Sequence, residues 1–353
     1  MKILTIVGAR PQFIKAAPLS RALRKAGIQE ILLHTGQHYD AAMSQIFFDE
    51  LGIPTPDIHL AIGSGPHGQQ TGRMLEAIEI ELVQQKPDKV LVYGDTNSTL
   101  AGALAAAKLN IPVAHIEAGL RSFNRKMPEE HNRVLTDHCS TFLFCPTQTA
   151  VDNLSIEGII QNVHLVGDPM LDATLHYLPI AEQKSSVLRD HNLDSGQYFL
   201  ATLHRPSNVD DPATLTHLLE TFDQLSLPVL FPVHPRTKSK IDDLNKIYPN
   251  IVQIHPVGYL DMLMLLNHTK TLLTDSGGLQ KEALFLKTPC ITLREETEWI
   301  ETLENNANQL TGPNAPKILQ ALDNLPHHSV FNANTTFGDG TSALQTTQIL
   351  AAA

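Results

Sequence analysis

The segment KILTIVGARPQFIK (2–15) decides the fold, because a nearly continuous apolar run is followed at once by a glycine and then by Arg10 and Pro11. A strand that is apolar at almost every position is typical of a parallel sheet covered on both faces, whereas a strand with one wet face alternates. Pro11 suits the first turn of a helix. The segment therefore predicts a buried strand over 2–7, and the residues after it predict a helix over 18–26 that ends at Gly27.

The same alternation of apolar runs and helical stretches continues along the chain. Strands are predicted over 30–36, 89–95, 112–119 and 141–146, and helices over 74–85 and 99–109. The rhythm restarts near residue 197, with strands predicted over 198–204, 228–235, 250–256, 271–278 and 289–294 and helices over 212–225 and 279–285. This succession is typical of a parallel, doubly wound α/β sheet. Because 353 residues exceed what one hydrophobic core usually spans, we expect two Rossmann-like domains, over 1–168 and 169–340.

The composition is that of an ordinary globular protein and argues against several classes. The net charge of −11 argues against a nucleic-acid binder, which would carry a broad basic face. No stretch approaches the roughly 20 apolar residues of a membrane span, and the short N-terminal apolar run lacks a signal-peptide cleavage pattern. Three scattered cysteines, Cys139, Cys145 and Cys290, are typical of reduced thiols. We therefore expect a cytoplasmic protein with neither nucleic acid nor a membrane as a partner.

Polar side chains suited to chemistry directly follow the predicted strands. They are Arg10, Asp95, Glu117, His204, His234 and the run 275–278. In open α/β sheets, ligands bind outside the carboxyl ends of the strands, so these side chains are expected to serve one kind of site. Each of them taken alone also fits a turn or a helix cap, and Asp95 in particular is a common N-cap type.

The stretch TDSGGLQKE (274–282) indicates a phosphate site. A strand ends there, two glycines let the backbone approach a ligand closely, and the free N–H groups of a helix N-terminus attract an anion. Ser276 adds a hydroxyl, and Arg10 can contact a phosphate with two hydrogen bonds. Because neither the dinucleotide nor the P-loop glycine pattern occurs at such a junction, a nucleoside diphosphate fits better than a nicotinamide cofactor. A plain turn or helix cap is the alternative.

Acidic residues follow the predicted strands in the first half of the chain. Asp95, Glu117 and Glu129 suit shared acid–base duty. Glu129 and its neighbour follow a proline, which also fits the preference of helix starts for negative charge. His204 and His234 follow strands in the second half, but no metal-binding spacing accompanies them, so no metal site is expected.

Taken in order, these segments resemble the non-hydrolysing UDP-N-acetylglucosamine 2-epimerases. The matching segments are GARPQFIK (8–15), GQH (36–38), GDTNSTLA (94–101), HIEAGLRS (115–122), PEEHNR (128–133), TLHR (202–205), PVHP (232–235), TDSGGLQKE (274–282) and FGDG (337–340). The resemblance implies a GT-B-type fold, in which two Rossmann-like domains face each other across a cleft. It also implies that a C-terminal helix, over about 341–353, crosses back onto the first domain.

The resemblance also implies roles for individual residues. The catalytic residues that it implies are Asp95, Glu117, Glu129 and His204. The implied substrate-binding residues are Arg10, Lys15, Arg133, His234, Ser276, Gly277, Gly278 and Glu282. A regulatory second UDP-sugar, described for some members, would contact Gln37, His38 and Arg73. The resemblance implies a UDP-sugar substrate and a homodimer, with neither a metal nor a nicotinamide cofactor.

The implied reaction explains why these residue types are needed. The hydrogen on carbon 2 of the sugar is not acidic, because no carbonyl lies beside that carbon. Elimination of UDP from carbon 1 with loss of this proton gives a 2-acetamidoglucal intermediate. Re-addition of UDP, with a proton returned to the opposite face, gives the epimer. Such a cycle requires a base, an acid and groups that hold the departing diphosphate.

Several alternatives stay open at the level of sequence. The stretches CITLREETEWIETLE (290–304) and SFNRKMPEEHNR (122–133) resemble relatives that act on UDP-2,3-diacetamido-2,3-dideoxyglucuronate, and Trp299 there either selects the substrate or packs. A GT-B glycosyltransferase would share the fold and the nucleotide site without needing several carboxylates. A hydrolysing epimerase would release the free sugar and UDP, and an inactive sugar-nucleotide sensor would only bind its ligand.

Overall fold

The computed structural model describes residues 1–37, 50–326 and 336–353. The chain divides into two compact units, one of Met1–Leu175 with Asn334–Ala353 and one of His176–Ala333. The boundary expected at residue 168 lies just before helix α7 (Pro169–Lys184), and the division in the structure falls inside that helix.

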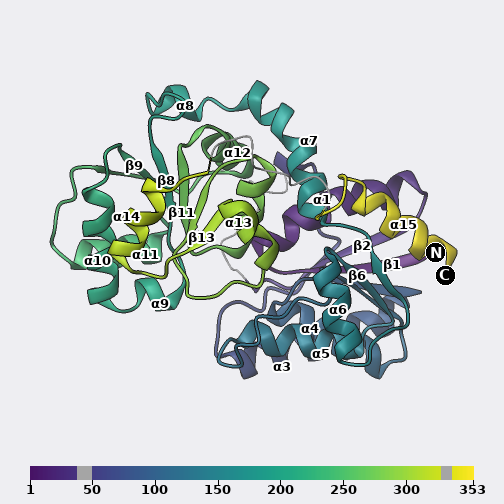
Figure 1. The fold of residues 1–353 in the computed structure, drawn as a ribbon. Coiled ribbons are helices and arrows are strands. Elements are labelled where there is room, and N and C mark those ends of the chain that lie inside the picture. Colours follow the sequence, from purple (N-terminus) through teal and green to yellow (C-terminus); the bar gives the residue numbers. More distant parts are fainter. Residues whose placement is uncertain (38–49, 327–335) are drawn as a thin grey trace. The chain divides into compact units, whose positions relative to one another are not determined.

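The first unit is built on a parallel sheet of seven described strands in the order β3-β2-β1-β4-β5-β6-β7. The strands are β1 (Lys2–Val7), β2 (Gln29–His34), β3 (Ile58–His59), β4 (Lys89–Tyr93), β5 (Val113–Ile116), β6 (Phe142–Cys145) and β7 (Val163–Leu165). The helices are α1 (Arg10–Lys25), α3 (His67–Gln85), α4 (Asn97–Lys108), α5 (Pro128–Cys139), α6 (Gln148–Ile156) and α15 (Ser342–Ala352). Helices α1 and α15 cover one face of the sheet, and α3, α4 and α5 cover the other (Figure 1).

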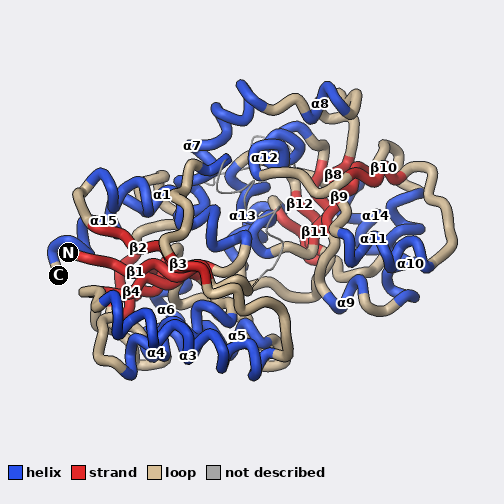
Figure 2. The backbone as a smooth tube through the Cα atoms, turned by 180° about the vertical axis from the view of Figure 1, so that it is seen from behind, coloured by secondary structure: helices blue, strands red, loops and turns tan. Residues whose placement is uncertain are grey.

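The second unit repeats this plan with a parallel sheet of six described strands in the order β10-β9-β8-β11-β12-β13. The strands are β8 (Phe199–Thr202), β9 (Val229–Pro232), β10 (Ile251–Ile254), β11 (Thr271–Thr274), β12 (Cys290–Thr292) and β13 (Asn308–Leu310). The helices are α8 (Val187–Asp190), α9 (Pro206–Val209), α10 (Pro212–Asp223), α11 (Pro235–Asp243), α12 (Tyr259–His268), α13 (Gly277–Phe285) and α14 (Ala315–Asp323), with a 3-10 segment over Ile300–Asn306. Helices α10, α11 and α14 pack on one face of the sheet, opposite α12 and α13 (Figure 2).

Both sheets are parallel throughout the described pairs, so the predicted α/β class with two doubly wound sheets is confirmed. Every residue of β4 is buried, as is every residue of β1 except Lys2. These strands are buried because helices lie on both faces of the sheet, as the apolar runs predicted, so neither side of a strand meets water. No described helix combines the length and the apolar character needed to cross a bilayer.

The first helix begins earlier than the sequence predicted. The expected helix over 18–26 is wrong at its start, because α1 runs from Arg10 and contains Pro18 inside it. The start at Arg10 is stabilised by Gln12, whose side-chain oxygen accepts hydrogen bonds from the backbone N–H groups of Gly8 (2.7 Å) and Ala9 (3.0 Å). Pro18 was mistaken for a helix start because proline favours the first turn, whereas tertiary packing here tolerates it eight residues in.

The C-terminal helix α15 packs on α1 within the first unit. Its N-terminus is held by Asp172 of α7, whose carboxylate accepts hydrogen bonds from the backbone N–H groups of Ser342 (3.2 Å) and Ala343 (2.8 Å). Just before it, the backbone passes so close to Gly167 that a Cβ there would lie 2.7 Å from the carbonyl oxygen of Phe337. A carboxylate at a helix N-terminus satisfies free N–H groups and complements the helix dipole.

We expect Asp172 to make stability depend on pH in a specific direction. Burial raises the pKa of its carboxyl to about 6 in the folded protein, against an ordinary value of 3.8. The folded state therefore binds this proton more tightly than the unfolded chain, so stability falls as pH rises from about 4 through about 6. Relative to Asp172→Asn, the wild type should lose on the order of 3 kcal/mol across that interval. Urea unfolding of both proteins at pH 4 to 7 measures this, and parallel curves would contradict it.

Candidate active site

The candidate residues lie where the winding of each sheet changes direction. In the first sheet, β1 and β4 are neighbours, with Arg10 following β1 and Asp95 following β4; Glu117 follows the next strand, β5. In the second sheet, β8 and β11 are neighbours, with His204 following β8 and Ser276 following β11. The loops beyond such a switch point are the usual ligand-binding position in open α/β sheets.

Glu117 is buried and lies in a strained backbone conformation. Its φ is +71°, in the left-handed region that non-glycine residues rarely adopt, which costs on the order of 1–3 kcal/mol. Its carboxylate forms a buried ion pair with Lys15 of α1. A Cβ on Gly94 would lie 3.1 Å from this carboxylate and 3.3 Å from the Lys15 ammonium, so only glycine fits the turn after β4. The pair is thus packed directly against the turn that leads to Asp95.

Asp95 is held by two consecutive residues of α5. Its carboxylate accepts a 2.5 Å hydrogen bond from Arg133 Nη2, and its carbonyl oxygen accepts a 2.9 Å hydrogen bond from the Asn132 amide. The carboxylate keeps 29% of its surface exposed, whereas Arg133 is buried. Arg133 also donates a 2.9 Å hydrogen bond to Glu130. Arg133, which the resemblance places against the substrate, therefore contacts two carboxylates of its own chain in this structure.

The adjacent glutamates at the start of α5 have opposite environments. Glu130 is buried and accepts hydrogen bonds from the backbone N–H groups of Ser122 and Phe123, both at 2.9 Å, and from the Ser122 hydroxyl at 2.8 Å. Glu129 is only partly buried and forms neither a hydrogen bond nor an ion pair with the residues that the structure describes. The structure therefore distinguishes a buried carboxylate that holds a loop, Glu130, from a partly exposed one, Glu129.

Of the remaining first-unit candidates, Arg10 is half-buried at the start of α1. Burial lowers the pKa of its guanidinium, and the nearby charge of Glu50 opposes that effect. The side-chain oxygen of Gln37 accepts hydrogen bonds from the backbone N–H (3.0 Å) and hydroxyl (2.6 Å) of Ser98. Arg73 is exposed on α3. His38 lies outside the described residues.

In the second unit, His204 is oriented by Asp275. The imidazole Nδ1 lies 2.9 Å from the Asp275 carboxylate, and the side chain keeps 53% of its surface exposed. Asp275 is fully buried and also accepts hydrogen bonds from the backbone N–H of Arg205 (2.9 Å) and the amide of Asn208 (3.1 Å). Burial acts to raise the pKa of Asp275, but the His204 ring and the backbone N–H groups of His204 and Arg205 hold it below its usual value. An ionised Asp275 fixes the N–H on Nδ1 and leaves Nε2 for a ligand.

The turn after β11 has the geometry that the glycine pattern predicted. Ser276 is the N-cap of α13, and its hydroxyl accepts a hydrogen bond from the backbone N–H of Leu279 at 3.5 Å; Gly277 and Gly278 are the first two residues of the helix. A Cβ on Gly277 would collide with the carboxylate of Glu298, which forms a buried ion pair with Arg294 at 2.8 Å. The Glu298 carboxylate thus lies against the first turn of α13, beside the N–H groups of the helix N-terminus that could attract an anion.

Three further candidates of the second unit differ in their burial. Glu282 is buried one turn into α13. His234 is the exposed N-cap of α11, and its Nδ1 accepts a 3.3 Å hydrogen bond from the backbone N–H of Arg236. Trp299 is buried with the Lys281 ammonium 3.6 Å from its ring centroid, a cation–π contact. Of the two roles considered for Trp299, this contact favours packing.

Comparison with known proteins identifies the family. Residues 21–351 match the family model described as UDP-N-acetylglucosamine 2-epimerase. The chain belongs to this family. Its members are isomerases, and the resemblance found in the sequence is confirmed.

Two curated relatives of the family have the same similarity to the chain but different names. The UDP-N-acetylglucosamine 2-epimerase of Methanocaldococcus jannaschii is 48% identical, with 99% of each chain covered. The UDP-2,3-diacetamido-2,3-dideoxy-D-glucuronate 2-epimerase of Pseudomonas aeruginosa is also 48% identical, again with 99% of each chain covered. A crystal structure of the M. jannaschii UDP-GlcNAc 2-epimerase in complex with UDP-GlcNAc and UDP superposes with a TM-score of 0.92 at 47% identity over 100% of both chains. The GT-B-type fold class is thereby confirmed.

Three buried polar residues near the candidate site, Asp275, His115 and Asp137, were not selected from the sequence. The sequence analysis included Asp275 in the run 275–278 without giving it a role of its own. Its position directly after a buried strand and before Ser276 could have indicated one. His115 and Asp137 form a buried 2.7 Å pair. A histidine inside the apolar strand 112–119 was a signal for such a pair, but no sequence pattern indicated its partner on α5.

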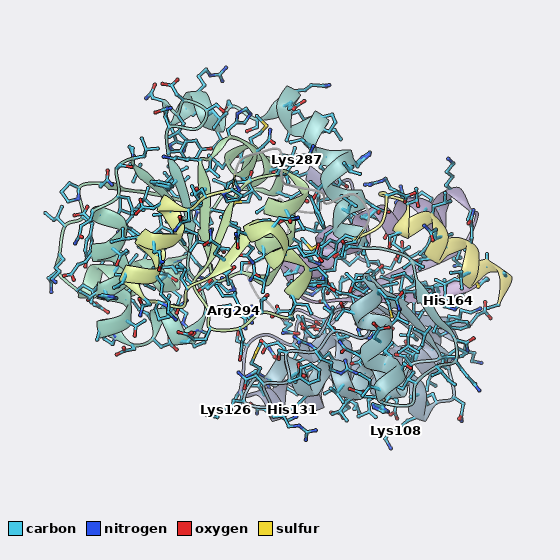
Figure 3. All side chains as sticks on the ribbon, in the orientation of Figure 1. Lys108, Lys126, His131, His164, Lys287 and Arg294 are labelled. Atoms are coloured by element: carbon cyan, nitrogen blue, oxygen red, sulfur yellow. The ribbon has the colours of Figure 1, made fainter. Side chains whose placement is uncertain are left out.

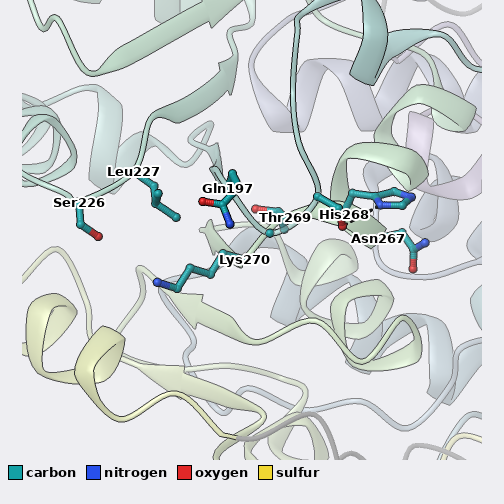
Figure 4. A pocket seen from close by; sticks show the side chains of 9 residues that line it. Gln197, Ser226, Leu227, Asn267, His268, Thr269 and Lys270 are labelled. Atoms are coloured by element: carbon teal, nitrogen blue, oxygen red, sulfur yellow. Dashed lines mark hydrogen bonds between the residues drawn. The ribbon is translucent and has the colours of Figure 1, made fainter.

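The described residues contain no group of three His, Cys, Asp or Glu side chains able to hold a metal ion. A hollow of about 470 Å³ does occur in the second unit, between Gly196, Leu227 and Lys270 (Figure 4). Its lining residues precede β8, β9 and β11, so it lies at the amino ends of these strands, whereas His204 and Ser276 follow the carboxyl ends. We therefore assign the hollow no part in the candidate site.

Replacing Lys15 should destabilise the protein strongly. In Lys15→Met the Glu117 carboxylate would stay buried without its ion-pair partner, which typically costs about 3–5 kcal/mol. Lys25→Met, at an exposed position of the same helix, is the matched control and should change stability by less than about 0.5 kcal/mol. Thermal and urea unfolding of both variants test this, and equal stabilities would contradict the importance of the pair.

Proposed function

We propose that this chain epimerises carbon 2 of UDP-N-acetylglucosamine, interconverting it with UDP-N-acetylmannosamine by elimination of UDP and re-addition. The observation that supports the proposal is that Asp95 and Glu117 follow the neighbouring strands β4 and β5, while Glu129 lies in the first turn of α5, the helix whose Arg133 bonds Asp95. The relative from M. jannaschii that bears the name UDP-N-acetylglucosamine 2-epimerase, and its structure in complex with UDP-GlcNAc and UDP, support the choice of substrate.

The three carboxylates would carry out the proton transfers. Asp95 and Glu117 each form an ion pair with a cation, Arg133 and Lys15 respectively, which holds the carboxylate in place. Glu129 has no such pairing within the described part of the chain and can take up or release a proton at the sugar. A proton is removed from carbon 2 by one carboxylate and returned to the opposite face by another, so both an acid and a base must be present in each direction.

The second unit would hold the departing UDP. The α13 N-terminus, with Ser276, Gly277 and Gly278, offers N–H groups and a positive helix end to the diphosphate. His204, oriented by Asp275, would assist departure of UDP through its Nε2. The further substrate contacts of the proposal are Arg10, Lys15, Arg133, His234 and Glu282, and a regulatory second UDP-sugar is assigned to Gln37, His38 and Arg73.

Domain boundaries, location, oligomeric state and cofactors are also part of the proposed function. We infer two functional domains, residues 1–168 with the helix over about 341–353, and residues 169–340. We also infer a cytoplasmic homodimer that needs neither a metal nor a nicotinamide cofactor and that binds neither nucleic acid nor membranes. The acidic net charge of −11 supports the exclusion of nucleic acid.

A second candidate substrate is UDP-2,3-diacetamido-2,3-dideoxyglucuronate. The observation that favours it is the 48% identity to the Pseudomonas aeruginosa 2-epimerase of that name, which equals the identity to the M. jannaschii enzyme. The elimination at carbons 1 and 2 would be the same for both sugars, so the same carboxylates would serve. The two substrates differ in the groups on carbons 3 and 6.

Proton NMR in deuterated water tests the function directly. With UDP-N-acetylglucosamine and enzyme alone, deuterium should enter carbon 2 of both epimers while the nucleotide stays attached in the products. Release of free N-acetylmannosamine with UDP would instead indicate a hydrolysing epimerase, and turnover of the diacetamido glucuronate alone would indicate the second substrate. Absence of exchange with either sugar would contradict epimerisation and leave a glycosyltransferase or a sensor.

Variants of the carboxylates test the assignment of roles. Asp95→Asn, Glu117→Gln and Glu129→Gln should each lower kcat by about 10²–10⁴-fold, the usual contribution of a positioned acid or base. Glu79→Gln, at an exposed position of α3, is the control and should keep the wild-type rate. Rates come from the exchange assay, and circular dichroism verifies folding. Near-wild-type turnover in all three variants would remove the acid–base assignment.

A further inference from the structure

A buried histidine–aspartate pair links the segments that carry the three candidate carboxylates. His115 lies in β5 and Asp137 in α5, and both side chains are almost completely buried. The imidazole Nδ1 lies 2.7 Å from the Asp137 carboxylate, and Nε2 lies 2.7 Å from the carbonyl oxygen of Gly94. Gly94 is the residue directly before Asp95, so the pair reaches the turn after β4.

Asp137 extends the contact to the turn after β5. Its second carboxylate oxygen accepts hydrogen bonds from the backbone N–H of Gly119 (3.2 Å) and from Arg121 Nη1 (2.7 Å). Arg121 in turn donates a 2.6 Å hydrogen bond from Nε to Glu157 of the segment after α6. The turn that bears Glu117 is therefore bonded to α5, the helix that contains Glu129 in its first turn.

The hydrogen-bond directions are determined by the acceptors. A backbone carbonyl oxygen can only accept, so His115 Nε2 carries the hydrogen toward Gly94. Burial acts to raise the pKa of Asp137, but His115 and Arg121 hold it below its usual value, so its carboxylate is an acceptor as well. Both ring nitrogens of His115 thus face acceptors. A side chain with one donor can replace either contact of His115, but not both.

The turn that His115 contacts needs such an anchor. Gly94 has φ +60° and Glu117 has φ +71°, so both turns contain backbone in the left-handed region. Glycine adopts this region without steric cost, whereas the strained Glu117 persists because the surrounding contacts fix it. A shift of the Gly94 peptide would move Asp95 away from Arg133 and would open the close packing of Gly94 on the Glu117–Lys15 pair. Displacements of about 1 Å at a reacting group can cost on the order of 10²-fold in rate.

We propose that His115, held by Asp137, is a positioning residue that fixes the Gly94–Asp95 turn relative to Glu117. This proposal rests on the proposed function, because it assigns His115 an effect on the proton transfer of Asp95. His115 itself is fully buried and would not touch the substrate. Its effect on the reaction passes through the Gly94 carbonyl and the residue that follows it.

The first experiment uses no substrate. Hydrogen exchange is measured by mass spectrometry in the wild type and in two variants of His115. In His115→Gln the amide N–H can replace the Nε2 donor toward Gly94. In His115→Asn the shorter amide can replace only the donor toward Asp137. We expect faster exchange over residues 93–97 in His115→Asn than in His115→Gln, with exchange over 199–202 of the second unit unchanged. Equal protection of residues 93–97 in all three proteins would overturn the proposal, whatever the enzyme's activity.

The second experiment is a double-mutant cycle. His115→Asn should lower kcat for deuterium exchange at carbon 2 by roughly 10–10²-fold with KM changed less than about threefold, because substrate contacts stay intact. In the Asp95→Asn background the same substitution should lower the rate by less than about threefold, since its effect passes through Asp95. His164→Gln, a histidine of β7 in the same sheet (Figure 3), is the control and should keep the wild-type rate.

The outcomes distinguish a failure of the positioning role of His115 from a failure of the proposed epimerase activity. An equal loss from His115→Asn in both backgrounds would overturn the positioning role and leave the proposed function standing. A loss of stability with unchanged kcat for the folded fraction would also overturn it. If the wild type exchanges no deuterium, the proposed function fails, and the hydrogen-exchange comparison still decides whether His115 fixes the turn.

Discussion

The site depends on one constraint of parallel sheets, namely that all strands of a sheet end at the same edge. Arg10, Asp95 and Glu117 are far apart in sequence, yet they follow strands β1, β4 and β5, which are hydrogen-bonded neighbours. The second sheet applies the same constraint to His204 and Ser276 through β8 and β11. Because the strand order 3-2-1-4 places helices on opposite faces beside the first strand, the loops there leave room for a ligand. The order of the strands alone therefore brings the backbone positions of these candidate residues to one edge of each sheet.

Charge pairing then determines which carboxylates are fixed and which are available. The ion pairs Lys15–Glu117 and Arg133–Asp95 involve buried cations, whose desolvation offsets most of the attraction, so such pairs add little net stability. Their consequence is positional, since each cation ties a carboxylate to a helix that packs on the sheet. Arg133 bonds both Asp95 and Glu130, which lies on the same helix. Of the two adjacent glutamates, Glu129 is therefore the one whose side chain bonds none of the described residues.

Much of this arrangement was predictable from sequence, and the failures have specific causes. Buried parallel strands such as β1 and β4 consist of apolar runs, and the glycine turn after β11 identified the helix N-terminus, so both were found. The start of α1 was missed because Pro18 mimics a helix start. The partners Arg133–Asp95 and His115–Asp137 were not found, because nothing in a single sequence states which polar residues meet across a strand and a helix. Glu129 and Glu130 likewise look identical in sequence, and only the burial of Glu130 distinguishes them.

A buried polar network has to be complete, because each unpaired group costs more than a neutral hydrogen bond returns. This explains why the network behind Asp95 and Glu117 contains so many members. His115 bonds Gly94 and Asp137, Asp137 bonds Gly119 and Arg121, and Arg121 ends at Glu157, whose carboxylate is partly exposed. The chain of contacts therefore runs from the turns after β4 and β5 to the partly exposed Glu157, with each buried member hydrogen-bonded to the next. Such a chain contacts the turns after β4 and β5, the second of which contains the strained Glu117, without adding a reactive group to the candidate site.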